Sequence, residues 1–265
     1  MCTTCGCGPD ELLDHVHDHD GSEHSHHGHD HSHDLTHDHG HDRLHKGGKR
    51  TVIAIEEDIL AKNNRLAAFN RALFKDKGIF VLNLVSSPGS GKTTLLERTL
   101  RDLSGIYRFS VIEGDQQTDN DAQRIAATGV AVRQVNTGAG CHLDAHQIMH
   151  GTEGFDLDRL DILMIENVGN LVCPASFDLG EQHKVVVLST TEGEDKPLKY
   201  PQMFHNSSVM LLNKTDLLPH LDFDVEKCKG YARRVNPALI IFEVSARTGQ
   251  GMEAWYRWLG EGVAR

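Results

Sequence analysis

The chain has 265 residues, 38% of them hydrophobic, which suits one sizeable folded domain. Ten acidic and no basic residues lie between positions 10 and 42, so the remainder carries only −1 of the net charge of −11 and offers no basic surface for nucleic acid. No run reaches the ~18 apolar residues of a membrane span and the first ten residues lack a signal-peptide pattern, so we expect a cytoplasmic protein without membrane contacts.

Three cysteines open the chain. Cys2, Cys5 and Cys7 lie within residues 1–7, a short segment punctuated by glycine. Disulfides are not expected in a reducing compartment, and exposed idle thiols are a redox liability. Three thiolates this close together can enclose one ion in square-planar or tetrahedral geometry, so we predict a metal motif at residues 1–7.

A tract rich in histidine and aspartate follows at residues 8–50, with thirteen histidines between positions 15 and 45. It has almost no apolar side chain to bury, so we expect it to be disordered. A solvated spacer is the alternative interpretation, but a spacer does not require imidazole, which is a good ligand for Ni²⁺, Zn²⁺ and Cu²⁺. We therefore predict several weak metal sites. The central candidates are His24, His26, His27, His29, His31 and His33.

Patterns of strand and helix alternate through the rest of the chain, residues 51–265. An amphipathic helix is expected at 52–77, and the apolar run 78–87 is typical of a parallel strand buried on both faces. Further strands are predicted at 107–112, 130–135, 160–166, 184–189, 208–212 and 238–244, and further helices at 92–103, 118–127, 141–150, 222–234 and 250–260. The alternation predicts an α/β domain with a mostly parallel sheet flanked by helices, whose ligands bind at the carboxyl ends of the strands.

The stretch SSPGSGKTT at 86–94 follows the first of these strands and opens a helix. It matches G-x-x-x-x-G-K-[ST] except that Ser86 replaces the first glycine, and an ordinary Gly-rich turn would not combine all these features. Lys92 is expected to reach the β and γ phosphates, and Thr93 to hold Mg²⁺ through its hydroxyl. The sequence thus predicts a P-loop NTPase domain. The nucleotide-binding candidates of the loop are Gly89, Ser90, Gly91, Lys92, Thr93 and Thr94.

A second nucleotide motif, NKTD, comes at the end of a later apolar strand. The Asp216 carboxylate can accept hydrogen bonds from N1–H and the exocyclic amine of guanine, and adenine offers neither donor. Asn213 and the stem of Lys214 would orient the loop and cover the base. Ser245 and Ala246 are similar to the GTPase loop that contacts the guanine O6. Together these residues favour GTP over ATP.

Two acidic residues are candidates for the magnesium side of the site. Glu166 ends the strand expected at 160–166 and either acts on Mg²⁺ through water or positions the attacking water; Asp115 follows the second strand. Loop capping is the alternative role for both residues. We identify no arginine that would complete the site, so slow hydrolysis is expected, as in a switch or timer.

Two cysteines and a histidine lie close to these motifs. Cys141 and His142 are expected at the start of a helix, and Cys173 follows Glu166 by seven residues. Two thiolates and one imidazole suit Ni²⁺ or Zn²⁺ with an open fourth position, which water or a second subunit would fill. An adjacent Cys-His pair alone is more often structural, and it is Cys173 that favours a metal site here. His146 is either a further ligand or simply solvated.

The combination of motifs resembles the HypB family of hydrogenase maturation GTPases, which help to insert nickel into [NiFe]-hydrogenase. The resemblance spans the whole chain and includes C-x-x-C-x-C, the His-rich insert, SPGSGKTT, GAGCHL, ENVGNLVCP, TEGEDKPLKYP and NKTD. It implies a tight nickel site in residues 1–7 and a weaker nickel or zinc site of Cys141, His142 and Cys173 at a GTP- and metal-dependent homodimer interface. It also implies two partners, a small zinc-bearing accessory protein and the hydrogenase large subunit precursor.

We therefore predict a GTP-hydrolysing metallochaperone that stores nickel and delivers it under the control of GTP. GTP and Mg²⁺ would order the segments around Asp115 and Glu166 and thereby draw the loops of Cys141 and Cys173 into one geometry. Two alternatives remain. One is a urease-type nickel-insertion GTPase, and the other is a protein that chiefly stores nickel in its histidine tract.

Overall fold

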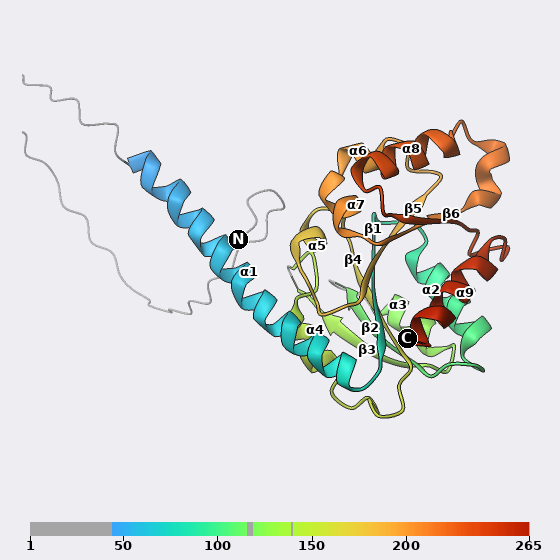
Figure 1. The fold of residues 1–265 in the computed structure, drawn as a ribbon, viewed down its shortest axis with the longest axis horizontal. Coiled ribbons are helices and arrows are strands. Elements are labelled where there is room, and N and C mark those ends of the chain that lie inside the picture. The colour runs from blue at the N-terminus through green and yellow to red at the C-terminus, as the bar shows by residue number, and fades with distance from the viewer. Residues whose placement is uncertain (1–43, 116–118, 139, 265) are drawn as a thin grey trace, which may run out of the picture.

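A computed structural model describes residues 44–115, 119–138 and 140–264. Within these residues seven strands form one parallel sheet in the order β3-β2-β4-β1-β5-β6-β7 (Figure 1). The strands are β1 (Phe80–Ser86), β2 (Phe109–Asp115), β3 (Ala131–Asn136), β4 (Ile162–Gly169), β5 (His183–Ser189), β6 (Val209–Asn213) and β7 (Ile240–Glu243). All seven correspond to strands predicted from the sequence, and the α/β fold with a P-loop is confirmed.

Helices cover both faces of the sheet. Leu82 and Leu84 of β1 contribute to the core on one face, and Val81 and Val85 alternate to the other, as the twofold periodicity of a strand requires. The first face is covered by α2 (Lys92–Leu103), α3 (Asn120–Ala126) and α9 (Met252–Val263). The second face is covered by α1 (Leu44–Asp76), α4 (Ala145–Gly151), α5 (Cys173–Ser176), α7 (Pro201–Asn206) and α8 (Val225–Val235). Two further short helices are α6 (Lys196–Lys199) and η1 (Thr215–His220).

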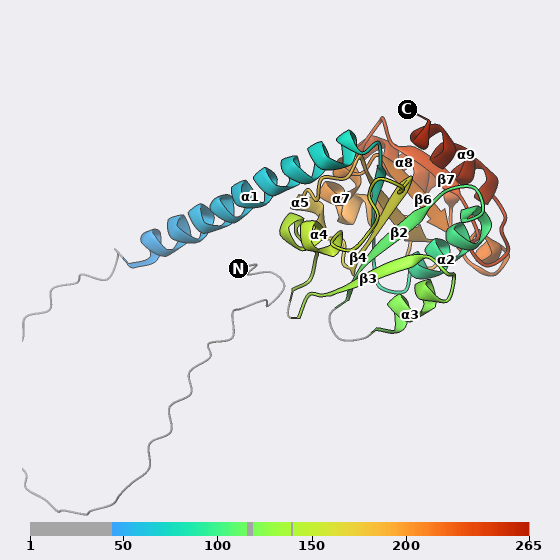
Figure 2. The same cartoon turned by 90° about the horizontal axis from the view of Figure 1, so that it is seen from below.

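Helix α1 extends well beyond the sheet (Figures 1 and 2). It begins at Leu44 and not at 52 as expected, so it crosses the predicted boundary at residue 50. Gly47 and Gly48 each disfavour a helix by about 1 kcal/mol relative to alanine, which is why local propensity pointed to a later start. Among the helices of the described residues, none is both long and apolar enough to cross a membrane.

The second half of α1 packs beside α4. Phe74 is buried, and two asparagines of α1 bind the first residue of α4. Asn63 Oδ1 accepts a hydrogen bond from the Ala145 backbone N–H (2.9 Å), and Asn70 Nδ2 donates to the Ala145 carbonyl (2.8 Å). Ile59, nearer the start of α1, is exposed. Helix α1 thus fixes the position of α4 through buried polar contacts as well as apolar packing.

The start of α4 corrects one expectation. Asp144 forms a capping box with Gln147: its carboxylate accepts from the Gln147 N–H (2.8 Å), and its own N–H donates to Gln147 Oε1 (3.0 Å). The helix therefore begins at Ala145, and Cys141 and His142 lie in the loop before it. The helices α5, α6, α7 and η1 were not expected, because four to six residues are too few to show a helical period.

Candidate nucleotide and metal sites

The predicted phosphate loop joins β1 to α2. Gly89 and Gly91 have φ angles of 76° and 89°, in the left-handed region that favours glycine. A Cβ at Gly91 would lie only 2.7 Å from Asn213 Nδ2, so this position has no room for a side chain. Ser86, which replaces the first glycine of the motif, is the buried last residue of β1, and its Oγ donates to the Ser87 carbonyl (2.8 Å). A serine therefore fits that position.

The side chains of Lys92 and Thr93 converge on Glu166 of β4. Lys92 Nζ lies 3.1 Å from Glu166 Oε1, and Thr93 Oγ1 donates to the same oxygen at 2.6 Å. Glu166 is 1% exposed, and its Oε2 has no hydrogen-bond partner among the described residues. A buried carboxylate oxygen without a partner is costly, and Mg²⁺ prefers carboxylate and hydroxyl oxygens. The pair of Thr93 and Glu166 therefore fits a magnesium ion.

A cavity of about 600 Å³ lies over the phosphate loop. All six predicted nucleotide-binding residues of the loop line it, as do Asp115 and Lys214. Glu166 is not among the described residues that line the cavity, but it contacts two residues that do, Lys92 and Thr93. Arg124 and Asp121 of α3 and Val168 and Gly169 of β4 complete the wall and were not predicted. The position of Val168 and Gly169 at the carboxyl end of β4, and of α3 after the carboxyl end of β2, is the signal that was available for them.

Arg124 is a basic residue that lines the same cavity. Its guanidinium donates to Thr94 Oγ1 (3.1 Å) and to Glu97 Oε2 (2.6 Å), and it also pairs with Asp121 (3.0 Å). The guanidinium is therefore held next to the phosphate loop by two carboxylates. The sequence provided no basis for placing an arginine there, because α3 and α2 meet only in the folded chain.

Residues of the NKTD motif bind the phosphate loop directly. Asn213 Nδ2 donates to the Ser90 carbonyl (3.1 Å), and Lys214 Nζ donates to the Gly89 carbonyl (2.7 Å). Among the described residues Lys214 is the only non-glycine with a positive φ (62°), a strained conformation that points to a functional constraint. The motif at the end of β6 is thus built into the nucleotide site.

The predicted base-selecting residues also come together. Asp216 Oδ1 accepts a hydrogen bond from Ser245 Oγ (2.6 Å), and Asn213 Oδ1 accepts from the Ala246 N–H (3.1 Å). Asp216, Ser245 and Ala246 are not among the described residues that line the phosphate cavity. Ser245 fixes the orientation of the carboxylate, and guanine selectivity remains a prediction from the motif.

Glu113 is a buried acid that the sequence analysis did not single out. It lies on β2 directly opposite Glu166 on β4 and is 3% exposed, and its Oε2 has no hydrogen-bond partner within the described part of the chain. Burial, reinforced by the Glu166 carboxylate, raises the pKa of Glu113 to about 8. A carboxyl group two residues before Asp115 in an otherwise apolar strand was the available signal.

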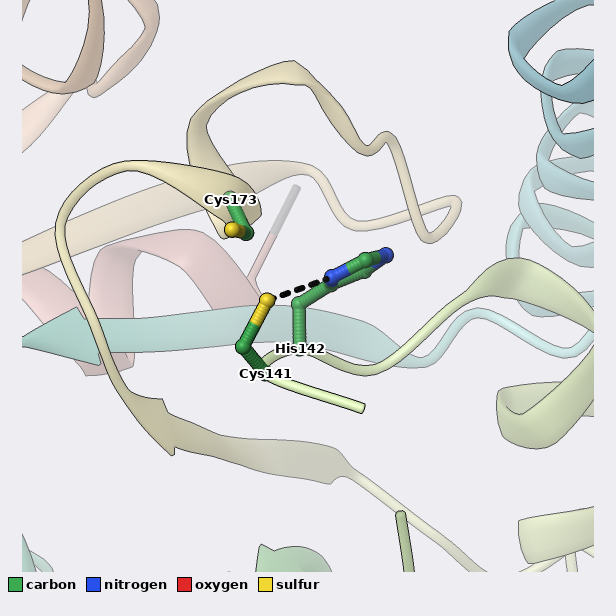
Figure 3. Close-up of side chains that lie close together, drawn as sticks. All are labelled: Cys141, His142 and Cys173. Atoms are coloured by element: carbon green, nitrogen blue, oxygen red, sulfur yellow. Dashed lines mark hydrogen bonds between the residues drawn. The ribbon is translucent and has the colours of Figure 1, made fainter. Parts of the chain in front are cut away.

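Cys141, His142 and Cys173 come together as predicted. One candidate ligand atom from each residue lies within 4.8 Å of the other two, and Figure 3 shows the side chains of Cys141 and His142, from the loop before α4, lying close to Cys173, the first residue of α5. Cys141 Sγ is 3.6 Å from His142 Nδ1. Two sulfur atoms and one imidazole nitrogen form a donor set that suits Zn²⁺ or Ni²⁺ with one coordination position left open.

The surroundings of these ligands favour the metal-binding form of the histidine. The His142 ring packs on Phe177 with centroids 3.9 Å apart. Burial lowers the pKa of His142, while Asp144 opposes the shift. This shift favours the neutral imidazole, the form that coordination requires. Both cysteines are largely buried, with 8% of Cys141 and 7% of Cys173 exposed.

Asn167 of β4 and Asn170, which directly follows this strand, bind the loop between β3 and α4 that carries Cys141. The Leu143 N–H donates to Asn167 Oδ1 (3.0 Å), and Asn170 Nδ2 donates to the Cys141 carbonyl (3.4 Å). Asn167 is the residue next to Glu166. One anchor of the metal-binding loop is therefore one residue away from the carboxylate that contacts the phosphate loop.

The same loop touches the end of β2. Leu143 packs so closely on Gly114 that an added Cβ would lie 2.7 Å from Leu143 Cγ. The Thr137 N–H donates to the Asp115 carbonyl (3.0 Å). The metal-binding loop thus contacts the immediate neighbourhood of both predicted magnesium-side residues, Asp115 and Glu166.

Other predicted ligands lie elsewhere. Cys2, Cys5, Cys7 and the histidines of the tract fall outside the described residues. His146 belongs to α4 and is not part of the Cys141 cluster. Cys228 is fully buried in the apolar core under α8, where burial raises the pKa of its thiol to about 12, so its role is structural.

These features define a P-loop nucleotide-binding protein in which a thiolate–imidazole metal site adjoins the nucleotide site. Residues 80–243 match the family described as CobW/HypB/UreG, nucleotide-binding domain. The chain belongs to the HypB family of hydrogenase maturation factors.

Relatives of known name support this assignment over most of the chain. The hydrogenase maturation factor HypB of Azotobacter vinelandii is 64% identical over 208 residues, 78% of this chain and 69% of the relative. HypB of Escherichia coli K12 is 53% identical over 286 residues, 98% of both chains. The crystal structure of HypB from Helicobacter pylori in complex with nickel superposes with a TM-score of 0.73 at 40% identity, covering 77% of this chain and 95% of that one. The family expected from the sequence is confirmed.

Proposed function

We propose that this protein is a GTP-hydrolysing metallochaperone that delivers nickel during hydrogenase maturation, with the nucleotide controlling metal transfer. The observation that carries the proposal is the hydrogen bond from Leu143 to Asn167 (3.0 Å). It joins the loop of Cys141 to the residue beside Glu166, so a change at the γ-phosphate is transmitted to the metal ligands by direct contact. The named relatives support hydrogenase maturation as the process that this coupling serves.

Binding of GTP would begin with a change in the partners that Lys92 and Thr93 contact. Lys92 and Thr93 bind Glu166 in the structure, and both are the residues that meet phosphate and Mg²⁺ in a P-loop. When GTP binds, Lys92 would exchange Glu166 for phosphate oxygens and the Thr93 hydroxyl would turn to Mg²⁺, which leaves the Glu166 carboxylate to hold Mg²⁺ or to position the attacking water. Bound Mg²⁺ would draw charge from the β- and γ-phosphates as the bond to the γ-phosphate breaks. Thr93, Glu166 and Asp115 are the residues that would hold it.

The effect of the nucleotide on the metal site follows from the contacts of Leu143. A shift of β4 at Glu166 or of β2 at Asp115 changes the position of Leu143, because it packs on Gly114 and binds Asn167. His142 precedes it directly, so the geometry of the ligand set changes with the nucleotide. By linkage, the nucleotide alters nickel affinity by the same factor by which nickel alters nucleotide affinity.

Nickel is the cargo that we propose, and zinc is an alternative occupant of the same donors. The His-rich tract would store nickel ahead of the domain and the Cys motif of residues 1–7 would bind it tightly. A second copy of the chain would complete the open position of the Cys141 site in the GTP state. A small zinc-bearing accessory protein and the hydrogenase large subunit precursor would receive the metal in the cytoplasm.

A second candidate function is nickel delivery to urease. HypB of Helicobacter pylori strain J99, 42% identical over 217 residues, is named a hydrogenase/urease maturation factor. The same site would serve either recipient, since the difference between them lies in the partner that docks.

The coupling can be tested on the full chain by thiol footprinting. Iodoacetamide alkylation of Cys141 and Cys173 is followed by peptide mass spectrometry while free Ni²⁺ is raised, once with GDP and once with a non-hydrolysable GTP analogue. We expect the half-protecting Ni²⁺ concentration at both cysteines to differ at least fivefold between the two states, the lower end of common allosteric couplings. The peptide-level readout keeps these cysteines separate from the tract and from residues 1–7. Equal concentrations in the two states would reject the proposal.

Two variants serve as controls. Lys92→Ala should abolish the difference between nucleotides while Ni²⁺ still protects both thiols. Cys141→Ser should abolish protection at Cys173 with either nucleotide, because the remaining donors no longer enclose the ion. Unchanged protection in Cys141→Ser would show that the two cysteines do not share a metal.

A further inference from the structure

Arg124 of α3 brings a guanidinium to the wall of the nucleotide cavity. Within the described part of the chain, the residues that line this cavity include three cations, Lys92, Arg124 and Lys214. Lys92 belongs to the phosphate loop and Lys214 to the NKTD motif, so both have an expected role. Arg124 is the cation to which neither motif assigns one.

The contacts of Arg124 place its guanidinium beside the start of α2. Nη2 donates to Thr94 Oγ1 (3.1 Å), and Thr94 directly follows Thr93, the predicted magnesium ligand. Thr94 also lines the cavity. The guanidinium therefore lies one hydrogen bond away from the segment whose backbone amides face the phosphates in a P-loop.

Two carboxylates orient this guanidinium before any nucleotide binds. Nη2 donates to Glu97 Oε2 at 2.6 Å, and Nη1 donates to Asp121 Oδ1 at 3.0 Å. The side chain of Glu97 is 12% exposed and that of Arg124 is 43% exposed, and Glu97 is not among the described residues that line the cavity. Glu97 thus holds the arginine in position and leaves it accessible from the cavity. A charge fixed in this way needs no reorganisation at the moment of reaction.

The guanidinium has donors to spare for a phosphate. It carries five N–H groups in a planar fork, which matches the oxygens of a phosphate. The contacts with Thr94, Glu97 and Asp121 each use one of these groups. The other N–H groups can therefore donate to phosphate oxygens while both carboxylates keep their hold.

Hydrolysis of GTP moves negative charge toward the oxygen that bridges the β- and γ-phosphates. The oxygen of a water molecule bonds to the γ-phosphorus as the bond from that phosphorus to the bridging oxygen breaks, and the electron pair of the broken bond stays with GDP. One proton of the water passes to the phosphate product or to solvent. An arginine beside the phosphates stabilises this shift of charge.

We propose that Arg124 is a catalytic residue that the chain supplies to its own nucleotide site. Its guanidinium binds the phosphate groups of GTP and stabilises the charge that develops during hydrolysis, and Glu97 is its positioning residue. The inference rests on the proposed function, because it assigns a residue to the hydrolysis proposed there. It requires none of the nickel ligands.

Single-turnover hydrolysis tests this role on the full chain with Mg²⁺. The chain is kept in excess over GTP labelled at the γ-phosphate, and the release of labelled phosphate is followed. We expect Arg124→Ala to lower the rate roughly 10²–10³-fold, the usual effect of removing one donor to developing charge, while the Kd for GDP stays within about threefold. Arg124→Lys should recover less than about a tenth of the parent rate, because an ammonium lacks the planar fork.

Two further variants separate this role from the loss of an ion pair. Arg108→Ala is the matched control: Arg108 pairs with Asp161 through Nε (3.0 Å) and Nη2 (2.8 Å) at the amino ends of β2 and β4, away from the nucleotide site. Its removal should leave the rate unchanged. Glu97→Gln should lower the rate roughly tenfold with GDP binding retained, because the guanidinium loses an orienting carboxylate.

Binding of GDP with aluminium fluoride distinguishes a catalytic from a structural role. This complex mimics the transition state, so Arg124→Ala should weaken its binding by a factor similar to the loss of rate, while GDP alone binds normally. Parent-like hydrolysis or parent-like aluminium fluoride binding in Arg124→Ala would overturn the inference and leave the proposed function intact. A loss of GDP affinity as large as the loss of rate would also overturn it, since Arg124 would then act in binding alone. Phosphate release by the parent no faster than by Lys92→Ala would instead contradict the proposed function itself.

Discussion

At the scale of a single residue, Glu113 is expected to make the stability of the folded domain depend on pH. Its pKa is raised from 4.5 to about 8, chiefly by burial and next by Glu166, so between these pH values the folded state holds a proton that the unfolded state has lost. Stability is therefore greatest below pH 4.5 as far as this group is concerned, and it declines as pH rises toward 8. The loss is at most about 1.4 kcal/mol for each pH unit. A carboxyl that must ionise beside Glu166 destabilises the nucleotide-free domain.

Glu113→Gln should remove this slope, because glutamine resembles the protonated acid. We expect the variant to be more stable than the parent at pH 8, by up to a few kcal/mol, and about equal to it near pH 4.5. Urea unfolding of nucleotide- and metal-free protein at several pH values measures the difference. Glu261→Gln, on the exposed last turns of α9, is the matched control and should keep the parent slope. Parallel curves for the parent and Glu113→Gln would show that Glu113 is ionised throughout.

At the scale of elements, a lysine holds the short helix that carries Cys173. Lys184 of β5 donates through Nζ to the carbonyls of Pro174 (2.8 Å), Ala175 (3.2 Å) and Phe177 (3.1 Å). Helix α5 has only four residues, so most of its carbonyls have no partner within the helix. The ammonium group replaces those partners, and burial lowers its pKa.

Lys184→Met should therefore loosen the metal site from the side of Cys173. Three buried carbonyls lose their donor, at a cost of about 1–3 kcal/mol in the free energy of unfolding. We expect the half-protecting Ni²⁺ concentration in the thiol footprint to rise severalfold, with GTP turnover less affected. Lys199→Met, which removes a 61% exposed lysine paired with Asp195, should change the unfolding free energy by less than about 0.5 kcal/mol. Unaltered nickel protection in Lys184→Met would mean that α5 is held by its apolar contacts alone.

Elements with a strong local pattern could be predicted from the sequence, and contacts between distant segments could not. Most of the strands are rich in apolar residues, although β3 contains Arg133 and Gln134, and the phosphate loop and NKTD motif have fixed spacings. The predicted start of α4 at residue 141 was wrong, because Asp144 was not recognised as the N-cap residue of this helix. Arg124 was missed because its place beside Thr94 depends on how α3 packs against α2. The bond from Leu143 to Asn167 joins residues 24 positions apart, and no sequence period indicates it.

At the scale of the whole molecule, storage of metal and control of metal are expected to be separable. The contacts that link the nucleotide and metal sites all lie between residues 114 and 170. The central histidines of the tract, at positions 24–33, precede α1, and the contacts of α1 with the domain that the structure describes lie in its second half, where they include those of Asn63, Asn70 and Phe74. Removal of residues 8–43 would thus leave α1 and every described contact of the coupled sites in place.

Deletion of residues 8–43 should lower the number of Ni²⁺ ions bound per chain by several while leaving GTP turnover within about twofold. The reason is that imidazole ligands are lost, whereas no residue of the two sites is touched. Equilibrium dialysis with Ni²⁺ measures the capacity, phosphate release measures turnover, and the footprint of Cys141 and Cys173 reports the inner site. Hydrogenase activity in cells then separates the alternatives. A delivery factor without the tract still supports hydrogenase activity when nickel is plentiful, whereas a protein that chiefly stores nickel loses its function when the tract is deleted. A fall in turnover to the level of Lys92→Ala would contradict the separation and place the tract within the working nucleotide site.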